Sequence, residues 1–349
     1  MDTRRFLFVL VLISAFIYVV SPLLLPLAMG AVFSALLYPI QKRLEDRKLH
    51  RYLASAIVTL GLTFGFLLPT FALVFTGAKL GIEKVGSLDV LKGVPHGTGG
   101  AGFFENLVDT LVVKASITHA LSTVGHFFPI KPEDIVETLR TVARTAGVKI
   151  GAGLGYFLTH LPGMVLSVGV MIVSIFFFVG DAQSLADFIR KHSVFSSRQT
   201  ERLMEAFTSM SRSVLLASLA SGFAQAFLFW VACLILGTSN TTLIGFLVFF
   251  ASFIPLLGSA PITFLVGLHE LFVVDTLTGV ILILLAVVIM GLDNIVRAMV
   301  LKGAGHIHPL LAFVAAFGGL QVFGMAGVFL GPVIAGVFLA MIETLAPAS

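Results

Sequence analysis

Two long apolar segments in the C-terminal part of the sequence are each interrupted by glycine and proline. The first covers residues 243–268 and is interrupted at 254–261, and the second covers residues 310–341 and is interrupted at 323–332. In a bilayer, an unpaired backbone N–H or C=O group costs several kcal/mol, so broken helices persist at membrane depth only where protein or a water-filled cavity satisfies them. Matched interruptions in two corresponding segments therefore indicate the binding site of a transporter.

The rest of the chain is equally apolar. Hydrophobic residues make up 58% of the 349 residues and charged residues only 11%, which indicates an integral membrane protein. The apolar runs are continuous and lack the alternation of a membrane β-barrel, and about 20 such residues form one spanning helix. We expect an all-α polytopic protein with about six full spans plus two re-entrant hairpins, or eight spans, and an external amphipathic helical insertion.

Several classes of function are excluded by what the sequence lacks. Cys233 is the single cysteine, so no intrachain disulfide is possible. The net charge of +4 comes from basic residues in short loops, which gives no basis for a nucleic-acid partner. No phosphate-binding loop or zinc-binding His-Glu-x-x-His motif occurs, so we expect neither an enzyme nor a cofactor, and transport must be driven by a gradient or by partners.

The N-terminal region, residues 1–78, is predicted to hold three spans. Spans at about 6–20 and 23–40 would be joined by a tight turn at Ser21 and Pro22, with the basic loop 41–51 and the N-terminus in the cytoplasm. A third span covers about 53–75. The alternative for the first segment is a signal peptide, but no convincing small-residue cleavage site follows it.

Residues 79–150 contain no spanning run, and we expect them to form an extracytoplasmic amphipathic helical insertion. A glycine-rich loop at 93–102 is followed by a helix start at 129–134, and apolar positions recur at helical spacing over 135–148. Region 151–212 then holds a span at about 155–179 and a basic, helical cytoplasmic loop at 181–212. A further span at 214–236 ends in a turn at 237–240.

Residues 213–349 are expected to form the transport core, for which two topologies compete. If the broken segments are re-entrant hairpins, Arg297 and Lys302 are cytoplasmic, the acidic Glu270 and Asp275 lie outside and a span covers 272–292; if they cross fully, these locations swap. Charge bias favours the hairpins, which also places the C-terminus in the cytoplasm. A weak repeat, residues 250–253 echoed at 317–320, suggests an inverted second copy. The alternative is that glycine and aromatic residues are simply common in membrane helices.

Candidate site residues come from these broken segments and from polar positions within spans. Asp293 lies four residues before Arg297, so the two share a helical face, and an ionisable pair at membrane depth indicates either a functional site or an interfacial cap. Gln225 lies within a span and must face a helix or a cavity. The substrate or ion pathway is predicted to involve Gln225, Ser252, Pro255, Gly258, Ser259, Pro261, Asp293, Asn294, Arg297, Gln321, Gly324, Gly327, Gly331 and Pro332.

The chemistry of these residues limits the solute. Their neutral oxygens suit a small polar solute or a monovalent cation better than a large anion. His306 and His308 have no nearby ligand partners, so we expect no metal site, and His308-Pro309 is interpreted as the turn into the second hairpin.

Together these motifs resemble the autoinducer-2 exporter family of bacterial inner-membrane permeases. The resemblance lies in segments 222–226, 252–255 with Gly258 and Pro261, Asp293-Asn294 with Arg297, and 308–311 running to 323–324 and 330–332. It is strong from about residue 215 onward, whereas upstream only the order of spans can be compared. Ala298 stands where family members often have proline, which puts the sharpness of that helix end in doubt.

The resemblance implies a multi-span permease of the bacterial inner membrane that assembles as a homo-oligomer, expected to be a pentamer. It also implies two activities, export of autoinducer-2 or sodium (lithium)/proton antiport. A membrane scaffold or regulatory protein, with residues 79–149 as a partner platform, is the alternative from another functional class.

Overall fold

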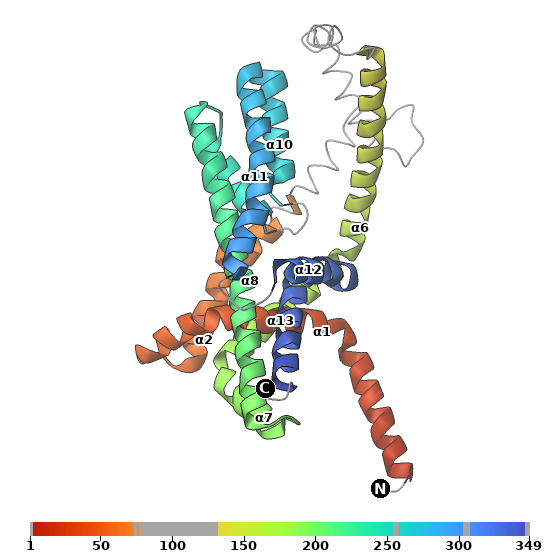
Figure 1. The fold of residues 1–349 in the computed structure, drawn as a ribbon, viewed down its shortest axis with the longest axis vertical. Helices are drawn as coiled ribbons and strands as arrows, with labels where there is room; N and C mark the ends of the chain where they lie inside the picture. The colour runs from red at the N-terminus through yellow and green to blue at the C-terminus, as the bar shows by residue number, and fades with distance from the viewer. Residues whose placement is uncertain (1–2, 73–74, 77–131, 254–257, 303–307, 346–349) are drawn as a thin grey trace. The chain divides into compact units, whose positions relative to one another are not determined.

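The structure, a computed structural model, describes residues 3–72, 75–76, 132–253, 258–302 and 308–345 (Figure 1). Within these ranges every regular element is helical and no strand occurs, which confirms the all-α prediction. In the part of the chain that the structure describes, five helical stretches are long and apolar enough to cross a membrane: Leu10–Asp46, Arg51–Ala72, Thr159–Gly180, Ser197–Ile235 and Leu310–Leu345. Residues 71–165 form one compact unit, and residues 1–70 with 166–349 form another.

The first helix corrects the predicted N-terminal hairpin. Helix α1 (Thr3–Asp46) is a single helix of 44 residues that continues through Pro22, Pro26 and Pro39 (Figure 1). The turn predicted at Ser21-Pro22 is therefore wrong, and one helix replaces the two expected spans. Each proline removes one backbone hydrogen bond and tends to kink a helix, and α1 bends along its length in Figure 1. The chain stays helical through the bend, because no other backbone pairing is available at membrane depth.

The next two apolar stretches match predicted spans. Helix α2 (Arg51–Leu62) continues through a π-helical turn η1 (Thr63–Leu67) to Ala72. Helix α6 (Pro132–Gly180) begins where the helix start was predicted and runs 49 residues without interruption, although it contains Pro162. Most of the predicted insertion, residues 79–150, lies outside the described residues.

The predicted basic loop is helical, as expected. Helix α7 (Ala182–His192) is followed by α8 (Ser197–Ile235), whose N-terminus is capped by reciprocal hydrogen bonds between Ser196 and Gln199. Helix α8 then continues through the predicted span to the turn at 237–240. There Gly237 and Asn240 adopt left-handed backbone conformations, with φ of 69° and 57°, and the chain reverses.

The first broken segment forms a helical hairpin against α8. Helix α9 (Thr241–Ala251) follows the turn. Gly245 packs on Trp230 and Gly222 packs on Ser252, which shows that α9 runs antiparallel to α8. Helix α10 (Ala260–His269) returns in the opposite direction, from Gln225 of α8 towards Cys233. A π-helical turn η3 (Glu270–Val274) leads into α11 (Thr276–Lys302), which packs antiparallel to α10.

The second broken segment is also a hairpin. Helix α12 (Pro309–Phe323), with His308 as its N-cap, and α13 (Gly327–Leu345) are joined by the 3₁₀ turn η4 (Gly324–Ala326). The interruption predicted to reach Pro332 ends at Ala326, because α13 continues through Pro332. The residues around this proline, Leu330 and Val333, are buried, and their packing compensates for the backbone hydrogen bond that proline removes.

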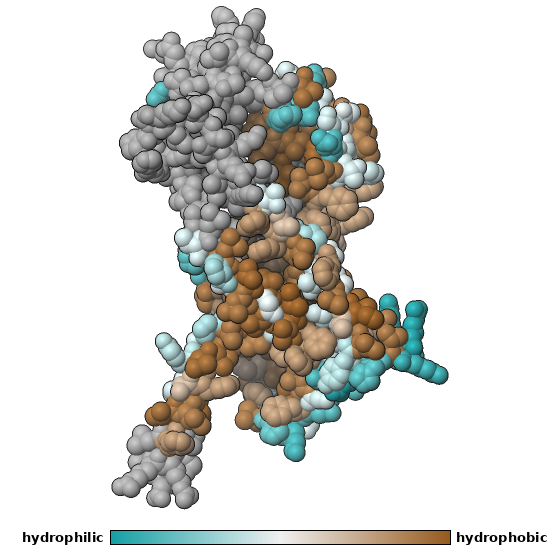
Figure 2. All heavy atoms as spheres, turned by 180° about the vertical axis from the view of Figure 1, so that it is seen from behind, coloured by the Kyte–Doolittle hydropathy of each residue, from teal (hydrophilic) through white to brown (hydrophobic). Residues whose placement is uncertain are grey.

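Two apolar clusters meet on α8. The first joins α1, α2 and α6 to α8 and α13 through residues such as Val32, Ile175, Met210 and Leu330. The second joins α8 to α9 and α11 through Phe229, Val248, Leu282 and Ile289, with α10 packed on it. Away from these clusters large apolar side chains remain exposed, and Figure 2 shows them over much of the visible face, as expected for helices that contact lipid.

Candidate functional site

A group of buried polar side chains lies where the first hairpin turns against α8. Ser221 and Gln225 come from α8, Ser252 follows α9, Ser259 precedes α10 and Thr263 is in its first turn; we call these five residues the central polar cluster. Each of the five is at most 2% exposed. Burying polar groups costs free energy unless they are hydrogen-bonded, so their concentration at one place indicates a polar site within an otherwise apolar core.

Gln225 connects the cluster through both ends of its amide. Its Nε2 atom donates to the Oγ atom of Ser221 one helical turn earlier, at 2.8 Å, and its Oε1 atom accepts from the hydroxyl of Ser259. The second hydrogen bond joins α8 to the residue that begins α10. The amide is therefore held in one orientation by groups on two different helices.

Close packing of glycine on serine brings α9 to the same place. A Cβ atom at Gly222 would overlap the Oγ atom of Ser252, so only glycine allows the two backbones to approach this closely. The Ser252 hydroxyl donates to the carbonyl of Phe249 at 2.7 Å. The Thr263 hydroxyl likewise donates to the carbonyl of Ser259, at 3.1 Å.

The start of α10 adds backbone polarity to the cluster. Gly258 has a φ of 53°, which favours glycine, and it precedes Ser259 at the N-cap position of α10. The Ser259 side chain makes no capping bond to the helix, because its hydroxyl donates to Gln225. The first N–H groups of α10 and the positive end of its dipole therefore face the cluster region, where they can attract oxygen atoms of a solute.

The tip of the second hairpin approaches the same stretch of α8 from the other end. Helix α13 is antiparallel to α8: Gln199 near the start of α8 donates to the carbonyl of Thr344 at 3.3 Å, and Leu330 lies in one cluster with Met210 and Val214. At 1.5 Å per residue, the turn at 324–326 falls near the level of Ser218. The two hairpin tips thus converge on the middle of α8.

Glycine packing holds the second hairpin closed. Cβ atoms at Gly319 and Gly327 would each overlap the carbonyl group of the other, and a Cβ atom at Gly331 would overlap the carbonyl oxygen of Ala315. Gly324, at the turn, has a φ of 62°. These glycines bring α12 and α13 into backbone contact at two levels about one helical turn apart.

The structure brings some of the predicted site residues together. Gln225, Ser252 and Ser259 meet in the central polar cluster, with Gly258 and Pro261 beside them in the chain, whereas Gly324, Gly327, Gly331 and Pro332 form the turn and packed interior of the second hairpin. Gln321 is exposed on α12. The backbone places Asp293, Asn294 and Arg297 in α11, but their side chains, like the whole of Pro255, lie outside the described residues.

The predicted site residues do not include four buried hydroxyl groups of α8 and α10, those of Ser211, Ser218, Ser221 and Thr263. Serine and threonine are common in membrane helices, so residue type alone does not single them out. The useful signal was spacing: Ser211, Ser218, Ser221 and Gln225 recur at intervals of seven, three and four residues, which places them on one face of α8.

One buried carboxylate lies outside the cluster. Glu270 is 5% exposed at the start of the π-helical turn η3, and its Oε1 atom lies 4.0 Å from Nδ1 of His269. Among the described residues, no group of three or more His, Cys, Asp or Glu side chains could hold a metal ion.

Comparison with known proteins gives a consistent result. The profile of the family described as "AI-2E family transporter" matches residues 7–346. A Treponema pallidum protein named "Putative transport protein" is 27% identical over 54% of this chain, and the match spans 47% of that relative. Escherichia coli "Putative transport protein YdiK" is 24% identical over 98% of this chain and 90% of its own length. A Halobacillus andaensis "Sodium-lithium/proton antiporter" is 24% identical over 58% of each chain.

Proposed function

Because the chain belongs to the AI-2E transporter family, we propose that it is a secondary transporter that exports a small polar solute, with autoinducer-2 as the first candidate. The observation that carries this proposal is the central polar cluster, formed where a broken segment turns against α8. Hydroxyl and amide oxygens together with the N–H groups of α10 can replace the hydration of an uncharged polar solute.

The proposal treats both helical hairpins as re-entrant in the bacterial inner membrane. Helices α9 and α10 would enter from the outer face and α12 and α13 from the cytoplasm, which puts α7 and both chain termini in the cytoplasm. Convergence of the two tips on the middle of α8 supports this arrangement, because alternating access requires a site near the midplane that each side reaches in turn. The basic residues Arg190, Lys191, Arg198 and Arg202 support the cytoplasmic placement of α7 and the start of α8.

Flux in proteoliposomes tests the proposal. The purified protein is reconstituted and uptake is measured for autoinducer-2, sodium and protons under imposed gradients. Gln225→Leu should lower the flux of the transported solute at least tenfold, because it removes the amide that links Ser221 to Ser259, while Thr242→Leu at an exposed position of α9 should leave it unchanged. Equal flux in both variants would remove the cluster from the transport route.

Sodium (lithium)/proton antiport is the second candidate, and the name of the Halobacillus andaensis relative favours it. In this reading Asp293, which shares a helical face with Arg297 on α11, carries the coupled ion or proton. A pH-sensitive dye inside vesicles under an imposed sodium or lithium gradient separates antiport from solute export. Asp293→Asn should abolish coupled flux without changing assembly, and unchanged coupling would remove this residue from the mechanism.

A homo-oligomer, expected as a pentamer, belongs to the same proposal, and native mass spectrometry of the detergent-solubilised protein measures it. A scaffold or regulatory role is the alternative from another class. It predicts that variants of the central polar cluster keep their cellular phenotype and that deletion of residues 79–149 abolishes it.

A further inference from the structure

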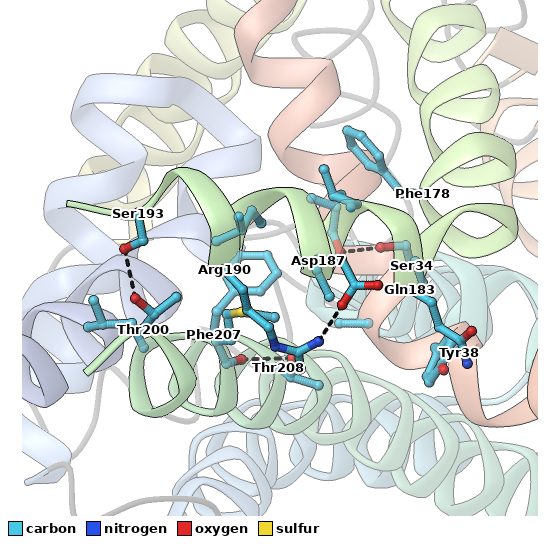
Figure 3. Close-up of a pocket in the computed structure, with 18 of the residues that line it drawn as sticks. Ser34, Tyr38, Phe178, Gln183, Asp187, Arg190, Ser193, Thr200, Phe207 and Thr208 are labelled. Atoms are coloured by element: carbon cyan, nitrogen blue, oxygen red, sulfur yellow. Dashed lines mark hydrogen bonds and ion pairs between the residues drawn. The ribbon is translucent and has the colours of Figure 1, made fainter. Parts of the chain in front are cut away.

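A cavity lies away from the central polar cluster. It has a volume of about 950 Å³ and is lined by α1, the end of α6, α7 and the N-terminal half of α8 (Figure 3). Its walls are mostly apolar, with hydroxyl and amide groups from Ser34, Tyr38, Gln183 and Thr208. In the proposed orientation the cavity opens towards the cytoplasm.

The charged groups at this cavity balance one another. The Arg190 guanidinium lies 2.9 Å from carboxylate oxygens of both Asp187 and Glu201, and Arg212 donates from Nε to the carbonyl of Ala35 at 2.8 Å. Because these two arginines and two carboxylates carry no net formal charge together, the cavity does not favour an anion. The groups that remain suit a small, uncharged, hydroxyl-bearing solute.

The cavity and the central polar cluster lie on one continuous face of α8. Thr200, Met204 and Phe207 line the cavity. From Phe207 the face continues through Ser211, Val214, Ser218, Ser221 and Gln225, which follow one another at intervals of four, three, four, three and four residues. Residues at this spacing stack along one side of a helix.

Along this face of α8, Ser211 follows the cavity residue Phe207 and precedes the residues of the central polar cluster. It is 0% exposed, and its hydroxyl oxygen has no hydrogen-bond partner among the described residues. A buried hydroxyl group without a partner is unfavourable. It becomes favourable if this position is exposed to water or to a polar solute at another stage of a transport cycle.

An apolar layer separates Ser211 from Ser218. Val214 lies one turn beyond Ser211 and is buried in one cluster with Met210, Leu330 and Val333. Leu330 and Val333 belong to α13, the second arm of the hairpin that turns at Gly324. Displacement of α13 would therefore open the route between the cavity and the central polar cluster.

We propose that this cavity is the cytoplasmic entrance of the transport route, that it admits a small uncharged polar solute, and that Val214 and Leu330 form the gate closing it in this structure. The inference rests on the proposed function and adds the entrance, the gate and the solute class to it. Its first test measures access directly, so it does not depend on knowing the solute.

Cysteine labelling provides that test. Because Cys233 is the single cysteine, Cys233→Ala gives a background in which one cysteine at a time is placed at Thr208, Ser211, Ser218 or Leu216. A membrane-impermeant thiol reagent is applied from the cytoplasmic side of inside-out vesicles. Thr208→Cys should react fastest, Ser211→Cys and Ser218→Cys more slowly, and Leu216→Cys, 48% exposed on another face of α8, should not react.

The gate is tested in the same vesicles. Adding Val214→Ser should raise the labelling rate of Ser218→Cys at least fivefold and leave that of Thr208→Cys unchanged. If Ser211→Cys and Ser218→Cys stay unlabelled in proteins that also carry Val214→Ser, while Thr208→Cys reacts, the cavity does not lead to the central polar cluster and the proposal is wrong. Gel filtration of every variant serves as the control for folding.

Flux measurements complete the test. Ala186→Trp fills the cavity, whereas Ser184→Trp adds the same side chain to α7 at a position that does not line it. Flux should fall at least tenfold in the first variant only. Equal flux in both would place the entrance elsewhere and leave the transport function intact, whereas no flux in the wild-type protein would contradict the transport function itself.

Discussion

The Ser259 hydroxyl donates a hydrogen bond to Oε1 of Gln225, which joins the residue before α10 to the middle of α8. The two residues are 34 positions apart in the chain, and both are buried. A buried polar pair of this kind fixes how the first hairpin sits on α8, because each group would otherwise lose its partner in an apolar environment.

Gln225→Leu should destabilise the protein by about 1–3 kcal/mol, because it removes the hydrogen bonds that Gln225 makes with Ser221 and Ser259. Gln225→Glu keeps the acceptor oxygens and should retain the Ser259 bond. Thermal unfolding in detergent, followed by intrinsic fluorescence or aggregation, measures the difference, with exposed Gln321→Leu as the control. A Gln225→Leu protein as stable as the control would show that these hydrogen bonds contribute nothing.

Gly222→Ala should destabilise the protein by about 1–3 kcal/mol through overpacking, since the new Cβ atom overlaps the Ser252 hydroxyl. Combining it with Ser252→Gly should recover most of the loss, because the obstructing atoms are gone. Gly169→Ala on α6 is a matched control, as no atom lies within 4 Å of the added methyl group. A double variant no more stable than Gly222→Ala would contradict the packing argument.

Neighbouring glycines of α12 should respond in opposite ways. Gly318→Ala adds a methyl group with nothing within 4 Å and should be neutral or stabilise the helix by up to about 1 kcal/mol. Gly319→Ala places its Cβ atom against the backbone of Gly327 and should separate α12 from α13, with loss of stability and of flux. The expected difference between Gly318→Ala and Gly319→Ala is tested by measuring the melting temperature and the proteoliposome flux of both variants side by side.

Acid should weaken the link between α7 and α8. Hydrogen bonds from Arg190 to Glu201, at 2.9 and 3.1 Å, lower the pKa of that carboxyl. Since the pKa is lower in the folded than in the unfolded protein, ionised Glu201 stabilises the fold above the ordinary glutamate pKa of about 4.3, and this contribution is lost as the pH falls through the lower folded value.

Both side chains are about half exposed, so this effect should be small and should shrink with added salt. Melting curves from pH 7 to pH 3 compare the wild type with Glu201→Gln. The wild type should lose more stability on acidification, by a margin that is largest at low ionic strength. Parallel pH profiles would show that the Arg190–Glu201 pair does not contribute.

Much of the fold could be predicted from the sequence where strong local signals coincide. Gly237 and Asn240 ended α8 as expected, and Pro132 began α6. The predicted turn at Pro22 was wrong, because proline stops a helix in water but is tolerated in an apolar helix, where the backbone has no alternative partner. The predicted extension of the second interruption to Pro332 was wrong for a related reason, since tight packing of α12 on α13 keeps helical geometry around this proline.

The site was only partly predictable. Gln225 could be identified because an amide within a span needs a partner, and Ser259 because it lies within the interruption of the first apolar segment. Its pairing with Gln225 depends on the reversal of the chain between α9 and α10, which no local pattern specifies. The cavity beside α7 was missed because it is built from ordinary apolar residues of helices far apart in the sequence.

Among the described residues, α8 is the one helix with members in both buried apolar clusters: Val214 in the first, with α13, and Phe229 in the second, with α9 and α11. Helix α8 is one continuous helix of 39 residues that connects the two clusters. Rotation of α8 about its own axis would therefore shift the packing of both hairpins at once.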